Sequence, residues 1–132
     1  MKYLLDTHAW VWWNMRPERL SDKVRTLIAE SKGYDEILLS AISVWEFCKL
    51  LEKQRLGISC DPREWLETAL AMSKLRLAPL SPAVAYRSTQ LPQLASTDPA
   101  DQIIVAMAQE EDAVLITKDK LILKSKCVRA LW

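Results

Sequence analysis

The 132-residue chain has very few glycines, and this excludes two common classes of phosphate-binding site. Only Gly33 and Gly57 occur. A P-loop and a dinucleotide-binding fingerprint each need several glycines, because backbone N–H groups must approach the phosphates closely. We therefore expect neither a P-loop nucleotide-binding protein nor a dinucleotide-dependent enzyme.

Cysteine and histidine are also scarce. The three cysteines, Cys48, Cys60 and Cys127, are far apart and form no CxxC pair, and His8 is the only histidine. This pattern does not suit a disulfide framework or a zinc site. A Ser–His–Asp hydrolase would have to use His8, and no serine elbow motif lies near it. We expect a reduced, cytoplasmic protein.

Long apolar runs and an excess of one charge are missing as well. No apolar stretch approaches the roughly 20 residues that span a membrane, and the first residues lack the layout of a signal peptide, so we expect no membrane association. The net charge is +1, so local basic residues or bound cations would have to hold a polyanion such as RNA. Half of the residues are hydrophobic, which suits a single domain over residues 1–132.

Short apolar runs alternate with helical patterns, which indicates an α/β protein whose parallel sheet is covered on both faces. The expected strands are residues 2–5, 37–39, 75–80, 114–116 and a last short one at 127–130. The expected helices are 9–15, 21–33, one that begins at Ser40 or Ser43, 61–73, one from Ser81 and one capped by Asp98. Residues 118–126 are expected to form a basic loop.

Four acids fall near one edge of this expected sheet. Asp6 ends the first strand, and Asp119 follows the fourth strand by three residues. Glu46 lies in the first turns of the helix after the second strand, and Asp101 lies in the first turn of the helix before the fourth. Because ligands of open parallel sheets bind at the carboxyl ends of the strands, we expect these four carboxylates to meet there.

Such a cluster needs protons or a cation. Two like charges a few ångströms apart repel by roughly 1–4 kcal/mol at surface-like dielectric constants. Carboxylate oxygens are hard ligands that select Mg²⁺ or Mn²⁺, and such ions promote phosphodiester hydrolysis. Taken singly, each acid also has an ordinary structural explanation. Asp6 could be a turn or cap residue at a strand end, Glu46 a solvated helix residue and Asp119 a turn residue. Asp98 is most simply a helix N-cap, with Asp101 as its capping-box partner.

Four motifs resemble those of PIN-domain nucleases, in order and spacing along essentially the whole chain. They are Tyr3-Leu-Leu-Asp6-Thr7-His8, Ser40-Ala-Ile-Ser43-Val-Trp-Glu46, Asp98-Pro-Ala-Asp101-Gln and Thr117-Lys118-Asp119. One motif alone is weakly specific, whereas the four together are quite specific. The chain length and the start LLDTHAWVWW most resemble the VapC-type toxins of bacterial toxin–antitoxin pairs.

This resemblance implies a three-layer α/β/α fold with a central, mostly parallel sheet of four to five strands. It implies an Mg²⁺- or Mn²⁺-dependent endoribonuclease, a cognate antitoxin and often a homodimer. The implied catalytic residues are Asp6, Glu46, Asp101 and Asp119, with Asp6, Asp101 and Asp119 as metal ligands. Residues that would orient carboxylates or waters are Thr7, Ser43, Thr117 and Asp98. The third motif departs from the family, with Ala100 in place of an aromatic residue and Gln102 in place of an arginine.

Basic and aromatic residues suggest how RNA and partner proteins would bind. Lys118, Lys120 and Lys49 are candidate RNA contacts, although a solvated surface explains them equally well. Trp10 and Trp13 are spaced to share one helical face and Trp12 lies elsewhere. Such aromatic residues are usually part of the core. The family resemblance implies that at least one of the tryptophans lies at an antitoxin or dimer surface.

Two other functions remain open. One is a non-catalytic PIN-like binding module. The other is an Mg²⁺-dependent phosphatase or phosphotransferase with Asp6 as nucleophile, which usually has a second acid two residues on, where this chain has His8.

Overall fold

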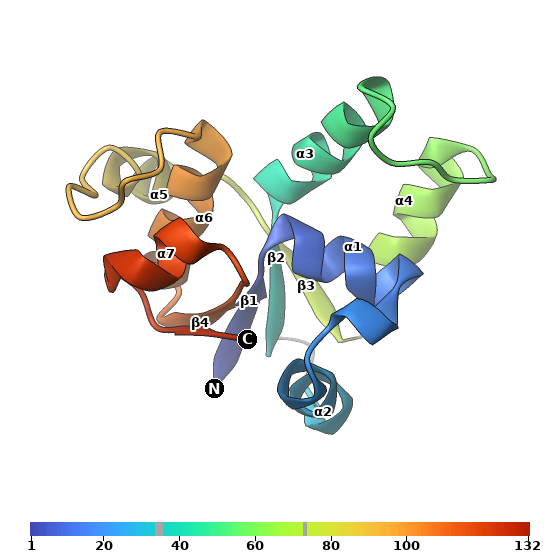
Figure 1. The fold of residues 1–132 in the computed structure, drawn as a ribbon, viewed down its shortest axis with the longest axis horizontal. Helices are drawn as coiled ribbons and strands as arrows, with labels where there is room; N and C mark the ends of the chain where they lie inside the picture. The colour runs from blue at the N-terminus through green and yellow to red at the C-terminus, as the bar shows by residue number, and fades with distance from the viewer. Residues whose placement is uncertain (34–35, 73) are drawn as a thin grey trace.

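The computed structural model describes residues 1–33, 36–72 and 74–132. Figure 1 shows strands in the middle of the molecule with helices around them. The strands are β1 (Lys2–Leu5), β2 (Ile37–Ser40), β3 (Leu75–Ala78), β4 (Ala113–Ile116) and β5 (Ala130–Leu131). The helices are α1 (Thr7–Met15), the 3₁₀ helix η1 (Pro17–Arg19), α2 (Asp22–Glu30), α3 (Ala41–Glu52), α4 (Pro62–Leu70), α5 (Pro82–Arg87), α6 (Pro99–Glu110) and α7 (Lys120–Ser125).

The five strands form one sheet in the order β3-β2-β1-β4-β5, and every pair is parallel. From β1 the chain first adds β2 and β3 on one side of the sheet. It then returns to add β4 and β5 on the other side. The strand order therefore reverses between β1 and β4, and a crevice at their carboxyl ends is where open α/β sheets bind ligands. The structure confirms the expected parallel α/β sheet.

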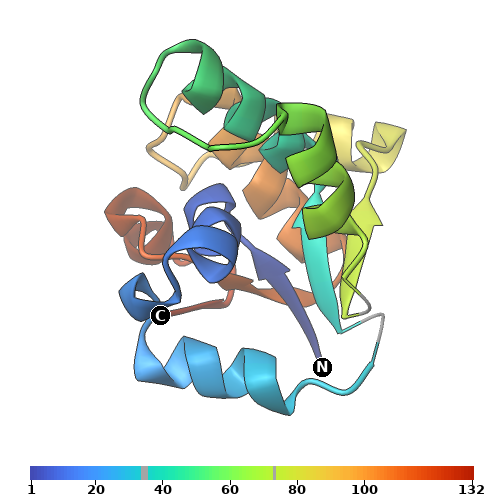
Figure 2. The ribbon, with the colours of Figure 1, turned by 90° about the vertical axis from the view of Figure 1, so that its right-hand side faces the viewer.

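Alternating side chains of the central strands build a separate core on each face of the sheet, as the two-residue repeat of a strand requires. Leu4, Leu38 and Leu115 pack with residues of α5, α6 and α7. Leu5, Leu39 and Ile116 pack with residues of α1, α2, α3 and α4. Figure 2 shows the same layers from the side. The expected three-layer α/β/α architecture is confirmed.

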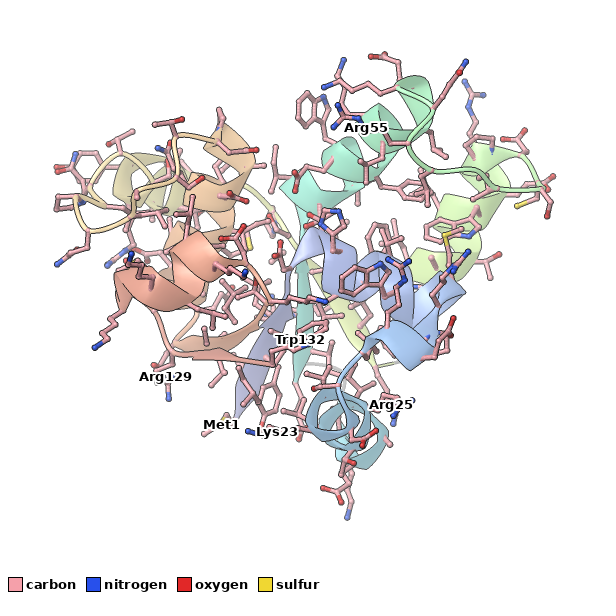
Figure 3. All side chains as sticks on the ribbon, in the orientation of Figure 1. Met1, Lys23, Arg25, Arg55, Arg129 and Trp132 are labelled. Carbon is pink, nitrogen blue, oxygen red and sulfur yellow. The ribbon has the colours of Figure 1, made fainter. Side chains whose placement is uncertain are left out.

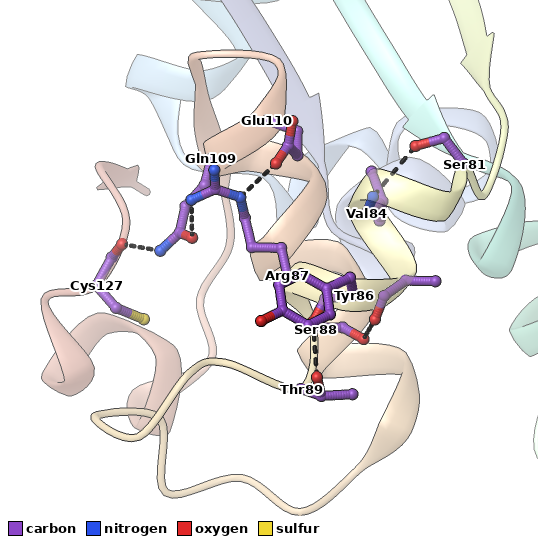
Figure 4. A network of polar contacts seen from close by, with 10 residues as sticks. Ser81, Val84, Tyr86, Arg87, Ser88, Thr89, Gln109, Glu110 and Cys127 are labelled. Atoms are coloured by element: carbon purple, nitrogen blue, oxygen red, sulfur yellow. Dashed lines mark hydrogen bonds and ion pairs between the residues drawn. The ribbon is translucent and has the colours of Figure 1, made fainter.

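On the face of the sheet that carries α5 and α6, polar contacts join these two helices and the segment before β5 (Figure 4). Arg87 at the end of α5 forms an ion pair with Glu110 at the end of α6. Gln109 Nε2 donates to the backbone oxygen of Cys127, 2.6 Å away, and so links α6 to the segment before β5. Because the Arg87 ion pair is partly exposed, we expect it to contribute little to stability.

Two local expectations are wrong. The expected basic loop contains a helix, α7, because the Asp119 carboxylate caps it by accepting the Ile122 N–H at 3.0 Å and Ile122 is fully buried. The last strand is later than expected: its pairing with β4 begins where Leu115 N–H donates to the Arg129 oxygen, so β5 is Ala130–Leu131.

Helix boundaries otherwise follow the capping residues in the sequence. Ser40, rather than Ser43, caps α3, since its hydroxyl accepts the Ile42 N–H at 3.2 Å. The expected end of the fourth long helix at residue 73 lies outside the described residues, and α4 ends at Leu70. In the part of the chain that the structure describes, no helix is long and apolar enough to cross a membrane.

Candidate active site

Asp6 lies at the carboxyl end of the central strand, where the strand order reverses. Its backbone N–H donates to the Ile116 oxygen at 3.0 Å and so ties the end of β1 to β4. Its Oδ1 accepts the Thr7 N–H at 2.8 Å, which caps α1, and its Oδ2 accepts the Thr117 hydroxyl at 2.7 Å. The first residue of α1 therefore orients one carboxylate oxygen, and the residue after β4 orients the other.

Thr7 also joins Asp6 to Glu46 on α3. The buried Thr7 Oγ1 lies 2.5 Å from Glu46 Oε1 and 2.8 Å from Ser43 Oγ. A hydroxyl has one proton, so Thr7 can donate to the carboxylate while it accepts from Ser43. Ser43 is fully buried in the first turn of α3. The Thr7 backbone N–H thus holds Asp6, and the Thr7 hydroxyl holds Glu46.

Asp101 is held by a residue that the sequence analysis did not single out. Ser96 is buried, and its hydroxyl donates to Asp101 Oδ2 at 2.8 Å. The Asp98 backbone N–H donates to the same hydroxyl at 3.3 Å rather than to the Asp101 carboxylate. Only one half of the expected capping box therefore forms, in which the Asp101 N–H donates to Asp98 Oδ1 at 3.4 Å. Asp98 itself is the N-cap of α6 and accepts the Ala100 N–H at 2.8 Å. Gln102 Nε2 donates to the Ser96 backbone oxygen at 3.3 Å.

Asp119 reaches the same edge of the sheet through Thr117. The Asp119 backbone N–H donates to Thr117 Oγ1 at 3.1 Å, and that hydroxyl donates in turn to Asp6. Asp119 caps α7 with Oδ1, as described above. Thr117 is fully buried, so it orients Asp6 and the backbone of Asp119 without contacting solvent itself.

The electrostatics of the acids indicate that they share one environment. Burial raises the pKa of Asp6, and Asp119 adds to the increase, while hydrogen bonds from Thr117 and Thr7 oppose it. Burial raises the pKa of Glu46 to about 7, with smaller contributions from the charges of Asp6, Asp98 and Asp101.

Asp101 behaves in the same way. Burial raises its pKa to about 6, opposed by the Ser96 hydrogen bond and increased by the charges of Asp98, Asp6 and Asp119. The β1 end, α3, the start of α6 and the start of α7 thus each bring an acid to this pocket. We call Asp6, Glu46, Asp101 and Asp119 the acidic pocket.

The acidic pocket suits a hard cation by its donor chemistry. All four side chains offer carboxylate oxygens, which are the ligands that Mg²⁺ and Mn²⁺ prefer. Within the described ranges, no three Asp, Glu, His or Cys side chains converge closely enough to form a complete metal-binding group. Mg²⁺ commonly keeps several waters and uses only one or two protein carboxylates, so the arrangement fits such an ion.

Two hollows are each lined by part of the acidic pocket. The larger, of about 730 Å³, is lined by Glu46 and by Ile42, Trp45, Lys49, Leu80 and Asp98. The smaller, of about 280 Å³, is lined by Asp6, His8, Trp12, Lys118, Asp119 and Trp132. Trp132, labelled in Figure 3, lies against α1 because its ring contacts Trp12.

The structure separates the three candidate RNA contacts. Lys49 lines the larger hollow, where it lies over the Trp45 ring and pairs with Glu52. Lys118 lines the smaller one and lies over the Trp12 ring. Lys120 is exposed at the start of α7 and is not among the residues that line these two hollows.

Comparison with known proteins identifies the family. The family model for the PIN domain matches residues 3–125, so the chain belongs to the PIN-domain family. Ribonuclease VapC22 of Mycobacterium tuberculosis is 34% identical over 117 residues, which cover 89% of this chain and 86% of the relative. The chain is therefore a homologue of a VapC ribonuclease, a family whose members generally depend on divalent metal ions.

Solved structures share the fold at lower sequence identity. DNA-bound VapBC from Salmonella typhimurium has a TM-score of 0.73 at 20% identity and covers 99% of this chain and 97% of that chain. VapBC2 from Rickettsia felis, bound to a promoter DNA fragment, has a TM-score of 0.72 at 18% identity and covers 99% of this chain and 98% of that chain. Both are toxin–antitoxin complexes, and at these identities the likeness concerns the fold.

Proposed function

We propose that this chain is a metal-dependent endoribonuclease, the toxin of a toxin–antitoxin pair, and that it hydrolyses RNA phosphodiester bonds at the acidic pocket. The observation on which this rests is that the pKa values of Asp6, Glu46 and Asp101 are all raised, by burial and in part by neighbouring acids from separate segments, at the point where the strand order reverses. Perturbed acids in a crevice are typical of catalytic sites. The homology to a VapC ribonuclease supports the choice of RNA as the substrate.

We assign the cation, Mg²⁺ or Mn²⁺, to Asp6, Asp101 and Asp119, of which one or two would bind it directly and the rest through its bound waters. When bound, such an ion supplies positive charge and electrophilic activation at a phosphodiester. The chain's own residues orient the ligands: Thr117 and the Thr7 N–H hold Asp6, and Ser96 holds Asp101. Outer partners of this kind are commonly as important as the ligands, because they fix the direction of each carboxylate.

Glu46 is the candidate for proton transfer. Its pKa of about 7 in the metal-free protein is close to the pH at which a general base or acid works best. Thr7 holds Glu46 Oε1 in place, so we assign Glu46 to accept a proton from the attacking water. Asp98 stays with the cap of α6 and adds negative charge near Glu46 and Asp101.

The larger hollow is a candidate surface for partner proteins. Trp45 is 55% exposed there, and Ile42, Leu50 and Leu80 add apolar area. The antitoxin in VapBC complexes of similar fold supports a cognate antitoxin for this chain, and we also propose a homodimer. We propose that the 132 residues act as one domain in the cytoplasm.

The test is cleavage of a mixed cellular RNA sample by purified chain without partner protein. The reactions contain Mg²⁺, Mn²⁺ or EDTA, and Asp101→Asn is assayed in parallel. We expect discrete fragments in either metal and none with EDTA or with Asp101→Asn. The matched control is Glu67→Gln, which neutralises an exposed acid on α4 and should cleave like the wild type.

The outcomes separate the proposal from its alternatives. Cleavage that persists in EDTA, or at full rate in Asp101→Asn, would contradict the assignment of the acidic pocket. No cleavage in any condition, together with no binding of Mn²⁺ by calorimetry, would favour a non-catalytic binding module.

A further inference from the structure

The smaller hollow combines aromatic rings with part of the acidic pocket. Asp6 and Asp119 line it together with the rings of His8, Trp12 and Trp132. A ligand that reaches these acids therefore has aromatic surface directly beside it. The hollow has a volume of about 280 Å³, which is slightly below the usual range for sites that enclose a whole small molecule.

Trp12 is the centre of this aromatic group. Its ring centroid lies 5.7 Å from that of His8 and 5.7 Å from that of Trp132, with interplanar angles of 53° and 69°. Neither ring is therefore stacked parallel on Trp12. Trp10 on the same helix is fully buried in the core, so the two tryptophans have different environments.

Two cationic side chains also lie close to the Trp12 ring. Lys118 Nζ lies 5.4 Å from the Trp12 centroid, and Arg19 Cζ lies 5.7 Å from it. Lys118 is exposed, and it follows Thr117 and precedes Asp119 in the chain. An exposed cation–π contact is weak, so Lys118 can leave the Trp12 ring and form an ion pair with an incoming anion. The hollow thus offers an aromatic surface and a nearby cation for a group that carries both a flat ring and a phosphate.

We propose that this hollow, the Trp12 subsite, binds the unstacked base of a nucleotide that flanks the scissile phosphodiester of RNA. The base stacks on Trp12, and Lys118 moves from the ring to an adjacent phosphate. Unpaired bases stack on aromatic side chains with little dependence on base identity. The inference rests on the proposed ribonuclease function and adds to it a position that binds the base next to the scissile phosphodiester.

The test compares an intact short single-stranded RNA with the same RNA that lacks one base next to a mapped cleavage site. The comparison is made twice, once with the missing base on the 5′ side of the site and once with it on the 3′ side. For one of the two positions, we expect the wild type to cleave the intact RNA with a kcat/KM on the order of tenfold higher than that for the abasic RNA. Trp12→Leu should cleave both RNAs alike, and Trp12→Phe should keep part of the preference. Each protein is tested on both RNAs from a single preparation, so the ratio of the two kcat/KM values does not depend on the fraction of folded protein.

Trp13→Leu is the matched control. Trp13 is the next residue on α1 and lines a different hollow with Pro17 and Leu20, away from the acids. This variant should keep the preference of the wild type. A preference of undiminished size in Trp12→Leu would overturn the Trp12 subsite, and so would the absence of any preference in the wild type.

A binding measurement separates failure of the subsite from failure of the proposed function. Asp101→Asn, with and without Trp12→Leu, is titrated with two fluorescently labelled short single-stranded RNAs of one sequence, one intact and one abasic at several positions, so that no mapped cleavage site is needed. Tighter binding of the intact RNA that disappears with Trp12→Leu would support the subsite even if no RNA were cleaved. Equal affinity for both RNAs would overturn it even if the wild type proved to be a ribonuclease.

Discussion

Neutralising Glu46 should stabilise the metal-free protein at high pH. The change is Glu46→Gln, which keeps an oxygen that can accept the Thr7 hydroxyl but removes the negative charge. In the folded protein, burial and three neighbouring acids disfavour that charge. The variant therefore loses a repulsion and keeps a hydrogen bond.

The sign and size of the effect follow from the pKa of Glu46. The folded protein binds the Glu46 proton more tightly than the unfolded chain, so the free energy of unfolding of the wild type falls as pH rises from about 4.5 to about 7. An increase from 4.5 to about 7 corresponds to about 3 kcal/mol at most. Glu46 is partly exposed, and solvent screening reduces the expected gain in the variant to about 1–2 kcal/mol.

The assay is urea-induced unfolding at pH 5 and pH 8 in EDTA, repeated at pH 8 with excess Mg²⁺. Glu46→Gln should be more stable than the wild type at pH 8 and nearly equal to it at pH 5. Mg²⁺ should remove that advantage, because the cation stabilises the ionised pocket of the wild type. Glu52→Gln, on the same helix but at an exposed acid paired with Lys49, should show no gain.

The reasoning is refuted if Glu46→Gln is less stable than the wild type by the same amount at both pH values. That result would mean that Glu46 contributes through packing or hydrogen bonding alone. It would also remove the electrostatic argument for a shared acidic pocket.

Three further predictions concern the residues that support the pocket. Thr117→Val keeps the shape of the side chain but removes the donor to Asp6, so kcat/KM for RNA should fall about 10- to 100-fold. Ser96→Ala removes a hydrogen bond that lowers the pKa of Asp101, so the pH at which Mn²⁺ binding is half-maximal should move upward in a calorimetric titration. Phe47→Ala removes a buried ring stacked 4.3 Å from Trp65, and urea unfolding should show a loss of about 3–5 kcal/mol.

The fold could be predicted because its physical causes are local. Short apolar strands buried on both faces and helices with clear N-cap residues such as Ser21 and Asp61 produce patterns that can be seen in the sequence. The helix α7 was missed because it has six residues and only one of them, Ile122, is fully buried. So short a helix depends on its cap and on burial of that one residue more than on a repeating pattern.

The placement of the acids at one sheet edge followed from the strand-end rule, but their supporting contacts did not. Ser96 lies in a loop with no periodic pattern, and its hydrogen bond to Asp101 depends on how that loop packs. The aromatic character of the smaller hollow also depends on tertiary structure, because Trp12 and Trp132 are far apart in the sequence. The catalytic and metal-binding roles of the acidic pocket stay predictions.

The most direct test of the central claim is calorimetric titration of the partner-free protein with Mn²⁺ at pH 7.5. We predict saturable binding that weakens at least about tenfold in Asp6→Asn and in Asp101→Asn, while Glu67→Gln binds like the wild type. Equal Mn²⁺ affinity in all four proteins would contradict the assignment of the acidic pocket as the metal site.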